Sequence, residues 1–282
     1  MPITSLEFDV VRKMIYDRAA IVLEPGKEYL VEARLGPLAR ADGCTINQLI
    51  ARLRSGTERS LSDRVVEALT TNETAFFRDV KPFETLKTTV LPEVIARKSA
   101  SRQLNIWCAA SSSGQEPYTI AMTLKEHFPQ LVNWQVRILC TDISVEMVNR
   151  TKMGRYSQLE VGRGLPAPML LKYFNRVGLE WEAAPELKRW LEVRQMNLAA
   201  PWAALGKQDV VFCRNVLIYF DIETKRTILR RIRDLISPDG YLFLGAAETT
   251  RGLDDQFESM HIGSGGCYRV LGAGKTLERR VS

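Results

Sequence analysis

The feature that most constrains this chain is the alternation of short apolar runs with helix-like stretches from about residue 88 onward. Stretches with helical spacing, such as Glu116–Phe128 and Glu223–Ile236, separate the apolar runs. The apolar runs have the length and composition of β-strands, and they are Leu104–Ala110, Val136–Thr141, Asp209–Cys213, Tyr241–Gly245 and Cys267–Leu271. Strands that alternate with helices build a mostly parallel sheet with helices on both faces. We therefore predict an α/β fold with a doubly wound, mostly parallel sheet.

The N-terminal part of the chain follows a different pattern. Phe8, Val11 and Ile15 recur at helical spacing, and no strand-like run interrupts the series. We predict a small all-helical domain over residues 1–80, followed by a second domain over residues 81–272.

One stretch interrupts the strand–helix alternation. Residues 155–195 are rich in glycine and proline and end in the strand-like Trp190–Arg194, which predicts an insertion with a small antiparallel β element. Further along, Pro238-Asp239-Gly240 reads as a turn. The polar tail over residues 273–282 is predicted to be disordered.

Cysteine and histidine usage excludes several kinds of site. The five cysteines are scattered and form no CxxC pair, which argues against a disulfide framework and against a zinc centre. Three of them, Cys108, Cys140 and Cys213, lie in apolar runs and are expected to be buried thiols. Only His127 and His261 are available for histidine chemistry, so we expect neither a metal site nor a Ser-His-Asp triad.

The chain carries no sign of export or of membrane insertion. No run approaches the ~18–20 apolar residues that cross a bilayer, and Glu7 and Asp9 stand where a signal peptide would be basic and then apolar. We expect a cytoplasmic protein. The net charge of +6 is mild and suggests an acidic partner rather than nucleic acid. Arginines outnumber acids over Arg34–Arg64, either as a solvated helical face or as a docking surface for an acidic helix.

The loop after the first predicted strand contains Ser111-Ser112-Ser113-Gly114, whose small side chains let a ligand lie against the backbone. It holds one glycine and is therefore not a G-x-G-x-x-G loop. Glu116 stands at the start of the following helix, where it would repel a pyrophosphate. A carboxylate there suits a cationic ligand such as S-adenosylmethionine, or it merely complements the helix dipole.

Two other predicted strands end in polar residues. Asp142 follows the second strand and can accept hydrogen bonds from ribose hydroxyls. Arg214 and Asn215 interrupt an apolar run, so they must face a cleft or find partners. Tyr219 and Phe220 follow as candidate cleft walls. Because ligands bind at the carboxyl ends of strands in open α/β sheets, these residues mark one candidate site.

The segment Leu69–Asp79 combines Asn, Thr and Arg with Phe76 and Phe77 just before the α/β region. It is either a capped helix start with a phenylalanine plug, or a lid that reaches a cofactor from the helical domain.

These motifs together resemble one family. The four matching segments, in order, are Thr71-Asn72-x-Thr74-x-Phe76-Phe77-Arg78, Ala109-Ala110-Ser111-x-x-Gly114-x-Glu116-Pro117-Tyr118, Thr141-Asp142-Ile143-Ser144 and Arg214-Asn215-Val216-Leu217-Ile218-Tyr219-Phe220. In sequence and order they resemble the CheR family of chemotaxis receptor glutamate methyltransferases, and the resemblance covers nearly the whole chain.

The resemblance implies a class I methyltransferase-like fold, S-adenosylmethionine as cofactor, S-adenosylhomocysteine as product and no metal. It implies transfer of a methyl group to glutamate side chains of chemoreceptors. Arg78 and Tyr219 are implied as catalytic residues. The implied cofactor-binding residues are Asn72, Thr74, Arg78, Glu116, Asp142, Asn197, Leu198, Arg214 and Asn215.

The implied partners are the cytoplasmic methylation helices of transmembrane chemoreceptors. Some family members also grip a pentapeptide at the receptor C-terminus with the inserted β-subdomain, although the glycine-rich loop associated with that grip is not evident in Val177–Trp181. Gln115 replaces an acid common in the family, and Ala246-Ala247 replaces a more polar segment.

Three other functions compete with this one. A nicotinamide dehydrogenase is disfavoured by the single-glycine loop and the lack of a hydride-handling histidine. A non-catalytic receptor-binding module would keep the fold without using the cofactor motifs. A methyltransferase of the same fold that acts on another acceptor shares every motif described above.

Overall fold

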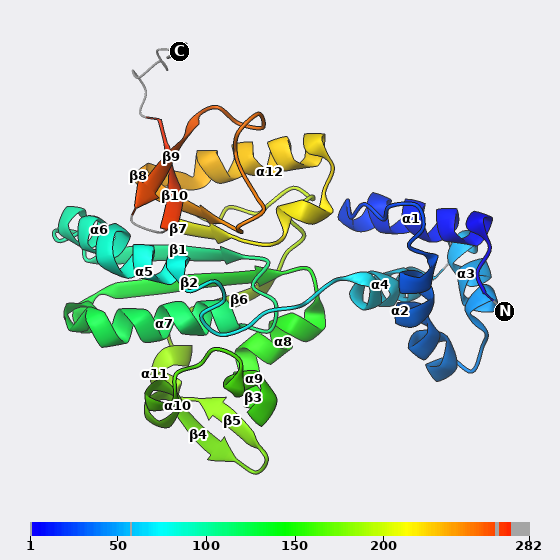
Figure 1. The fold of residues 1–282 in the computed structure, drawn as a ribbon, viewed down its shortest axis with the longest axis horizontal. Helices are drawn as coiled ribbons and strands as arrows, with labels where there is room; N and C mark the ends of the chain where they lie inside the picture. The colour runs from blue at the N-terminus through cyan, green and yellow to red at the C-terminus, as the bar shows by residue number, and fades with distance from the viewer. Residues whose placement is uncertain (1, 57, 263–264, 272–282) are drawn as a thin grey trace.

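The computed structural model describes residues 2–56, 58–262 and 265–271. A helical bundle, a large sheet flanked by helices and a small three-stranded sheet lie side by side (Figure 1). The predicted α/β class, with an N-terminal helical part and a small antiparallel element, is confirmed. The predicted tail over residues 273–282 lies outside the described residues.

Four helices form the N-terminal bundle, namely α1 (Ser5–Ala19), α2 (Glu28–Ala41), α3 (Ile46–Ser55) and α4 (Arg59–Leu69). Thr4 and Thr45 begin α1 and α3 with reciprocal capping boxes, which satisfy backbone donors at each helix start. One apolar face of each helix packs into a shared core that includes Val11, Val31 and Leu49. The bundle therefore has a hydrophobic core of its own.

A segment without helix or strand, residues 70–80, connects the bundle to the rest of the chain, and we call it the strap. It leads into a continuous helical stretch of α5 (Lys81–Thr85), a π-helical turn (Leu86–Val90) and α6 (Leu91–Arg97). Phe77, Asp79 and Val80 in the strap have positive φ angles of 50°, 67° and 46°. Such conformations are strained in residues other than glycine, so surrounding contacts must hold the strap.

The large sheet has seven strands in the order β6-β2-β1-β7-β8-β10-β9. Their bounds are β1 (Gln103–Ala109), β2 (Gln135–Asp142), β6 (Leu191–Gln195), β7 (Gln208–Cys213), β8 (Ile236–Leu244), β9 (Phe257–Ile262) and β10 (Gly265–Val270). The pairs from β6 to β8 are parallel, and β10 runs antiparallel to both neighbours. The strand order reverses at β1, which lies between β2 and β7.

Both faces of the sheet are covered, which explains why its strands read as continuous apolar runs. Ile106 and Cys108 of β1 join one core, with α5, α6 and α7 (Gln115–His127) on that side. Trp107 and Ala109 point to the other face and pack with α12 (Ile222–Leu235). Cys108, Cys140 and Cys213 are buried as predicted, and burial raises the pKa of each thiol.

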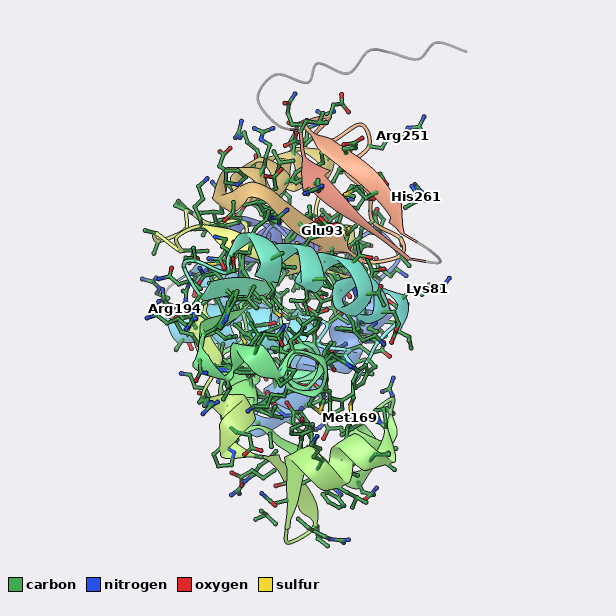
Figure 2. All side chains as sticks on the ribbon, turned by 90° about the vertical axis from the view of Figure 1, so that its left-hand side faces the viewer. Lys81, Glu93, Met169, Arg194, Arg251 and His261 are labelled. Carbon is green, nitrogen blue, oxygen red and sulfur yellow. The ribbon has the colours of Figure 1, made fainter. Side chains whose placement is uncertain are left out.

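The small sheet has the order β3-β5-β4 and is antiparallel. It forms a subdomain on one side of the large sheet, where Figure 2 shows Met169. Its elements are β3 (Arg155–Ser157), α9 (Gln158–Gly162), α10 (Ala167–Tyr173), β4 (Phe174–Val177), β5 (Glu180–Ala183) and α11 (Pro185–Lys188).

Two local expectations are corrected. We expected Trp190–Arg194 to belong to the antiparallel insertion, but β6 pairs parallel with β2 at the edge of the large sheet. We expected a turn at Pro238–Gly240, but these residues lie within β8, whose pairing with β7 shifts register between Gln208 and Val210. The positive φ of 63° at Asp239 accommodates the irregularity.

The bundle and the α/β domain contact each other through a shared helix cap. Glu67 of α4 accepts hydrogen bonds from the hydroxyl of Ser144 and from the backbone N–H groups of Val145 and Glu146. These residues begin α8 (Val145–Met153), and Ser144 is its N-cap, as predicted. The bundle therefore supplies a carboxylate to the positive end of a helix in the other domain. Among the described residues, no helix is both long and apolar enough to span a bilayer.

Candidate functional site

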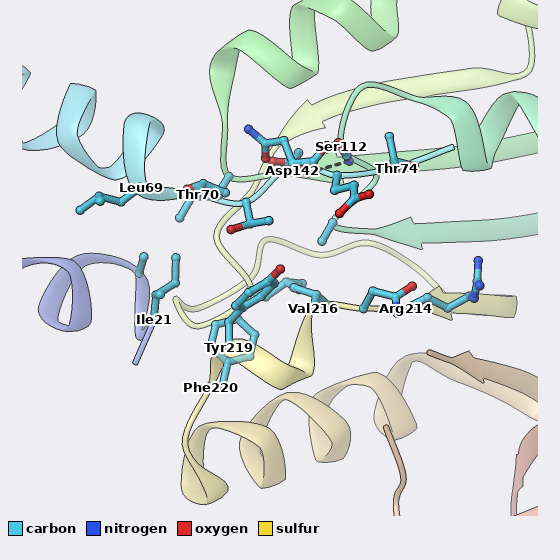
Figure 3. A pocket seen from close by; sticks show the side chains of 18 of the residues that line it. Ile21, Leu69, Thr70, Thr74, Ser112, Asp142, Arg214, Val216, Tyr219 and Phe220 are labelled. Carbon is cyan, nitrogen blue, oxygen red and sulfur yellow. Dashed lines mark hydrogen bonds between the residues drawn. The ribbon is translucent and has the colours of Figure 1, made fainter. Parts of the chain in front are cut away.

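A cavity of about 240 Å³ lies between the helical bundle and the carboxyl ends of β1, β2 and β7. The bundle contributes the segment that follows α1, residues 21–24, and the strap contributes residues 70–74. Figure 3 shows Asp142 and Ser112 on one side of the cavity, with Tyr219 and Phe220 on the other. The cavity lies where the strand order reverses, which is the usual ligand position in a doubly wound sheet.

All ten residues predicted for the site line this cavity. They are Asn72, Thr74, Arg78, Glu116, Asp142, Asn197, Leu198, Arg214, Asn215 and Tyr219. The fold thus brings together five segments that are far apart in the sequence. The role of each residue remains a prediction.

Asp142 is the last residue of β2, and only 5% of it is exposed. Backbone N–H groups bind its carboxylate from two sides. Its Oδ2 accepts a hydrogen bond from the backbone N–H of Ser112 at 2.7 Å, and its Oδ1 accepts one from Ser144 at 3.0 Å. Burial raises the pKa of Asp142, and these backbone donors oppose the rise. Each carboxylate oxygen keeps acceptor capacity for a hydroxyl group in the cavity.

Arg214 forms a buried ion-pair cluster at the end of β7. Its Nη1 donates to Glu116 Oε2 at 2.8 Å, and its Nη2 donates to Asp79 Oδ2 at 2.7 Å and to the carbonyl of Arg78 at 3.1 Å. The sequence suggested Glu116 as a carboxylate available to a cationic ligand, but its charge is already paired with Arg214. Burial raises the pKa of Glu116, and Arg214 opposes the rise. The cluster also holds the strained end of the strap.

Two buried polar atoms beside the cavity lack a partner among the described residues. They are the Nε of Arg214 and the Oγ of Ser111. Buried donors without acceptors are unfavourable, so a ligand with an acceptor group would stabilise this end of the cavity. The carboxylate of an amino-acid-like cofactor could accept a hydrogen bond from the Arg214 Nε. The carboxylate of Asp142 could accept hydrogen bonds from the hydroxyls of the cofactor's ribose. The residues present therefore fit S-adenosylmethionine.

Arg78 and Tyr219 keep free donors in the cavity wall. Within the described residues, Arg78 pairs with no acid, and its Nη1 donates only to the carbonyl of Glu73 at 2.9 Å. The hydroxyl of Tyr219 has no hydrogen-bond partner in the same part of the chain. Both groups are available to an anion.

Asn197 joins the two domains at the cavity rim. Its Nδ2 donates to the carbonyl of Arg18 at 2.8 Å, and its Oδ1 accepts from the N–H of Ala199 at 2.9 Å. Nearby, the N–H of Val22 donates to the carbonyl of Tyr219 at 2.9 Å. Both halves of the Asn197 amide are therefore engaged within the protein.

Sequence reasoning gave no role to Glu248, which organises the loop after β7. Its carboxylate accepts four backbone N–H bonds of 2.6–2.9 Å, from Gly245, Asn215, Val216 and Leu217. The loop contains Asn215 at a φ of 58°, so this support holds a strained position. The feature of the sequence that could have indicated this role is an acidic residue, Glu248, shortly after the apolar run that forms β8.

Other lining residues had no signal in the sequence. Residues 21–24, Lys27 and Leu30 reach the cavity from the loop before α2 and from its first turn. Gln115, the departure from the family pattern, is buried, and its Oε1 accepts a hydrogen bond from Ser113 Oγ at 2.8 Å. Its amide thus braces the loop that follows β1.

The two histidines lie away from the cavity. Neither His127 nor His261 is among the described residues of the cavity wall, and His261 lies on β9 at the sheet edge (Figure 2). No group of three or more His, Cys, Asp or Glu side chains suited to a metal ion occurs in the described part of the chain.

Family models and named relatives match this chain over most of its length. The family model described as the CheR methyltransferase SAM-binding domain matches residues 72–265, and the CheR methyltransferase all-alpha domain matches residues 6–70. Chemotaxis protein methyltransferase 1 of Pseudomonas aeruginosa is 42% identical over 277 residues, covering 96% of this chain and 100% of that protein. Chemotaxis protein methyltransferase Cher2 of Pseudomonas putida is 40% identical over 272 residues, covering 94% and 98%. The chain therefore belongs to the CheR methyltransferase family.

Proposed function

We propose that this protein transfers a methyl group from S-adenosylmethionine to glutamate side chains of chemoreceptors, forming glutamate methyl esters. The observation that supports this most is the interdomain cavity, whose wall includes residues from every motif shared with the family. Relatives named chemotaxis protein methyltransferase match the chain over nearly its full length.

The cofactor roles follow from the donors and acceptors around the cavity. Asp142 accepts hydrogen bonds from the ribose, and the unpartnered Nε of Arg214 donates to the carboxylate of the amino-acid portion. Asn72, Thr74 and Leu198 complete the wall. When bound, S-adenosylmethionine supplies a methyl group already activated by its sulfonium. The protein's contribution is to orient the reactants and to exclude water.

The acceptor needs no general base in this proposal. A glutamate carboxylate has an ordinary pKa near ~4.3, so it is ionised at neutral pH and is itself the nucleophile. Arg78 and Tyr219 donate hydrogen bonds that orient the carboxylate, so that its reacting oxygen lies in line with the methyl group and the sulfur. Opposite charges disappear in the transition state, so a cavity closed against water favours the reaction.

The proposed receptor-docking surface is narrower than the sequence suggested. Arg52 and Arg64 pair with Asp42 on the surface of the bundle, and Arg52 also pairs with Glu58. Arg54 and Arg59 are exposed, and neither forms an ion pair within the described residues. These two arginines are the better candidates for contact with an acidic methylation helix.

A receptor C-terminal pentapeptide is a second proposed partner, for the small β-subdomain. Only Gly178 and Leu179 separate β4 from β5, so the turn between them is short. Titration calorimetry of the protein with such a peptide tests this proposal, and absence of heat at millimolar peptide would reject it.

The deciding experiment is transfer of labelled methyl from S-adenosylmethionine to receptor-containing membranes. We expect label in the receptor and its release as methanol in mild base, because carboxylate esters are base-labile. Membranes whose receptor methylation-site glutamates are replaced by alanine serve as the control. A base-stable product would indicate another acceptor. Cofactor binding without transfer would indicate a non-catalytic module, and reduction of a bound nicotinamide cofactor would indicate a dehydrogenase.

A further inference from the structure

The loop between β1 and α7, residues 110–114, has an unusual backbone. Ala110, Ser112 and Gly114 have positive φ angles of 58°, 49° and 97°. Two of the three are not glycine, so the loop does not hold this shape by local preference alone. This is the loop whose backbone N–H at Ser112 binds Asp142.

Two buried hydroxyl groups fix consecutive carbonyls of this loop. Thr151 Oγ1 donates to the carbonyl of Ser112 at 2.9 Å, and the Tyr156 hydroxyl donates to the carbonyl of Ser113 at 2.8 Å. Both side chains are fully buried. Thr151 lies in the last turn of α8 and Tyr156 in β3, so both bonds come from the entry into the small β-subdomain.

The packing leaves little room for this arrangement to shift. A Cβ at Gly114 would lie 2.9 Å from the Tyr156 hydroxyl and 3.0 Å from Thr151 Oγ1, so only glycine permits the approach. The Tyr156 ring meets Phe76 of the strap edge-to-face, with centroids 5.0 Å apart. Tyr156 therefore contacts both the loop after β1 and the strap, two of the segments that line the cavity.

We propose that Thr151 and Tyr156 are positioning residues for the cofactor, forming a hydroxyl clamp on the loop that follows β1. The carbonyls of Ser112 and Ser113 belong to the two peptide units that follow the Ser112 N–H, so fixing them restrains the backbone on one side of the N–H that donates to Asp142. The Asp142 carboxylate is then held in the orientation that a ribose requires. This inference rests on the proposed cofactor site, and it gives the β-subdomain a part in cofactor binding separate from any contact with a receptor.

The test measures S-adenosylhomocysteine affinity by titration calorimetry, together with the unfolding temperature. Tyr156→Phe removes only the hydroxyl, and loss of one buried hydrogen bond should weaken binding about threefold to tenfold. Thr151→Val should act in the same direction. Tyr241→Phe is the matched control, because the Tyr241 side chain is also fully buried and its hydroxyl donates to Glu93, which is not part of the loop or of the clamp.

A clamp predicts that all three variants lose some thermal stability, while only Tyr156→Phe and Thr151→Val lose affinity. Unchanged affinity in Tyr156→Phe would overturn the clamp and leave the cofactor site standing. An equal loss in Tyr241→Phe would also overturn it, since the effect would then be one of general stability. A wild-type protein that binds no S-adenosylhomocysteine would overturn both the clamp and the proposed function.

Discussion

Two ion-pair clusters in this molecule have the same plan and different surroundings. In the cavity, Arg214 is held between Glu116 and Asp79, and its side chain is 2% exposed. In the bundle, Asp42 is held between Arg52 and Arg64, whose side chains are 38% and 45% exposed. Buried charges depend on their partners for solvation, whereas exposed ones have water as an alternative. The two clusters have similar ion-pair distances, but removal of one charge should cost far more stability in the buried cluster than in the exposed one.

The largest expected effect is that of removing the buried cation. Arg214→Met leaves Glu116 buried without its partner and should lower the free energy of unfolding by about 3–5 kcal/mol in denaturant titrations. Adding Glu116→Gln should recover much of the stability without restoring cofactor binding. If Arg214→Met unfolds like the wild type, the two clusters are energetically alike and the comparison fails.

Asp142 tests the cavity itself. Asp142→Ala removes the acceptor for two ribose hydroxyls and should weaken S-adenosylmethionine binding at least about tenfold, as measured by calorimetry. The folded variant should keep its circular dichroism spectrum. Wild-type affinity in a folded variant would show that the ribose is bound elsewhere.

Exposed charge should act on the partner instead of on the fold. Arg54→Glu with Arg59→Glu should raise the apparent KM for receptor severalfold at low salt and leave cofactor affinity unchanged. The effect should shrink with added salt, because exposed charges are screened over ~8 Å at physiological ionic strength. Lys225→Glu with Arg230→Glu on α12 changes the net charge equally and serves as control. An equal KM change in that pair would point to net charge rather than a docking surface.

The two clusters should also respond to pH with opposite sign. Burial raises the pKa of Glu116 above 4.5, so the folded state binds its proton more tightly than the unfolded state does. The tighter proton binding by Glu116 stabilises the folded state at low pH, and this contribution is lost as pH rises through the folded-state pKa of Glu116. Relative to wild type, Glu116→Gln should gain stability as pH rises from about 4 toward 7. Paired denaturant titrations at each pH measure the difference, and a constant difference would contradict the assignment.

Asp42 gives the opposite and smallest effect. Hydrogen bonds from Arg64 and Arg52 lower the pKa of Asp42, so its contribution is present above the unfolded pKa and is lost as pH falls through the folded pKa. Asp42→Asn should therefore cause a slight loss near pH 7 that vanishes in acid, with unchanged cofactor affinity. Exposed pairs contribute little, so thermal unfolding should barely move. A large shift would mean that the exposed cluster behaves like the buried one.

The sequence was informative wherever a property is local. Strands buried on both faces appear in the sequence as apolar runs. Ser144 predicted the start of a helix, and its hydroxyl caps α8 in the structure. Asp142, Arg214 and Asn215 could be found because polar groups end or interrupt apolar runs, whereas Asn72, Thr74, Asn197 and Leu198 were implied only by the family resemblance. Their presence in one cavity follows from the parallel sheet, which brings strand ends to one edge.

What escaped prediction depends on pairing across long separations. Trp190–Arg194 reads as a strand wherever it pairs, and only the fold determines that its partner is β2. Arg214 and Glu116 are 98 residues apart, so nothing near either one indicates the ion pair. The hydroxyl of Tyr156 likewise reaches a carbonyl 43 residues away. Tertiary contacts of this kind are fixed by topology and not by neighbouring sequence.

The cap that Glu67 places on α8 has a consequence for how ligands enter and leave. The helical bundle and the α/β domain each contribute part of the cavity wall. The hydrogen bonds from α8 to Glu67 are among the contacts that hold the two domains together. A molecule filling the cavity touches both parts and strengthens their association by mass action. A ligand in the cavity therefore opposes separation of the two domains. The rate at which a protease cleaves the strap then measures how much of the protein has ligand bound. Protection should rise with S-adenosylhomocysteine concentration, and Glu67→Gln should need more ligand to reach the same protection.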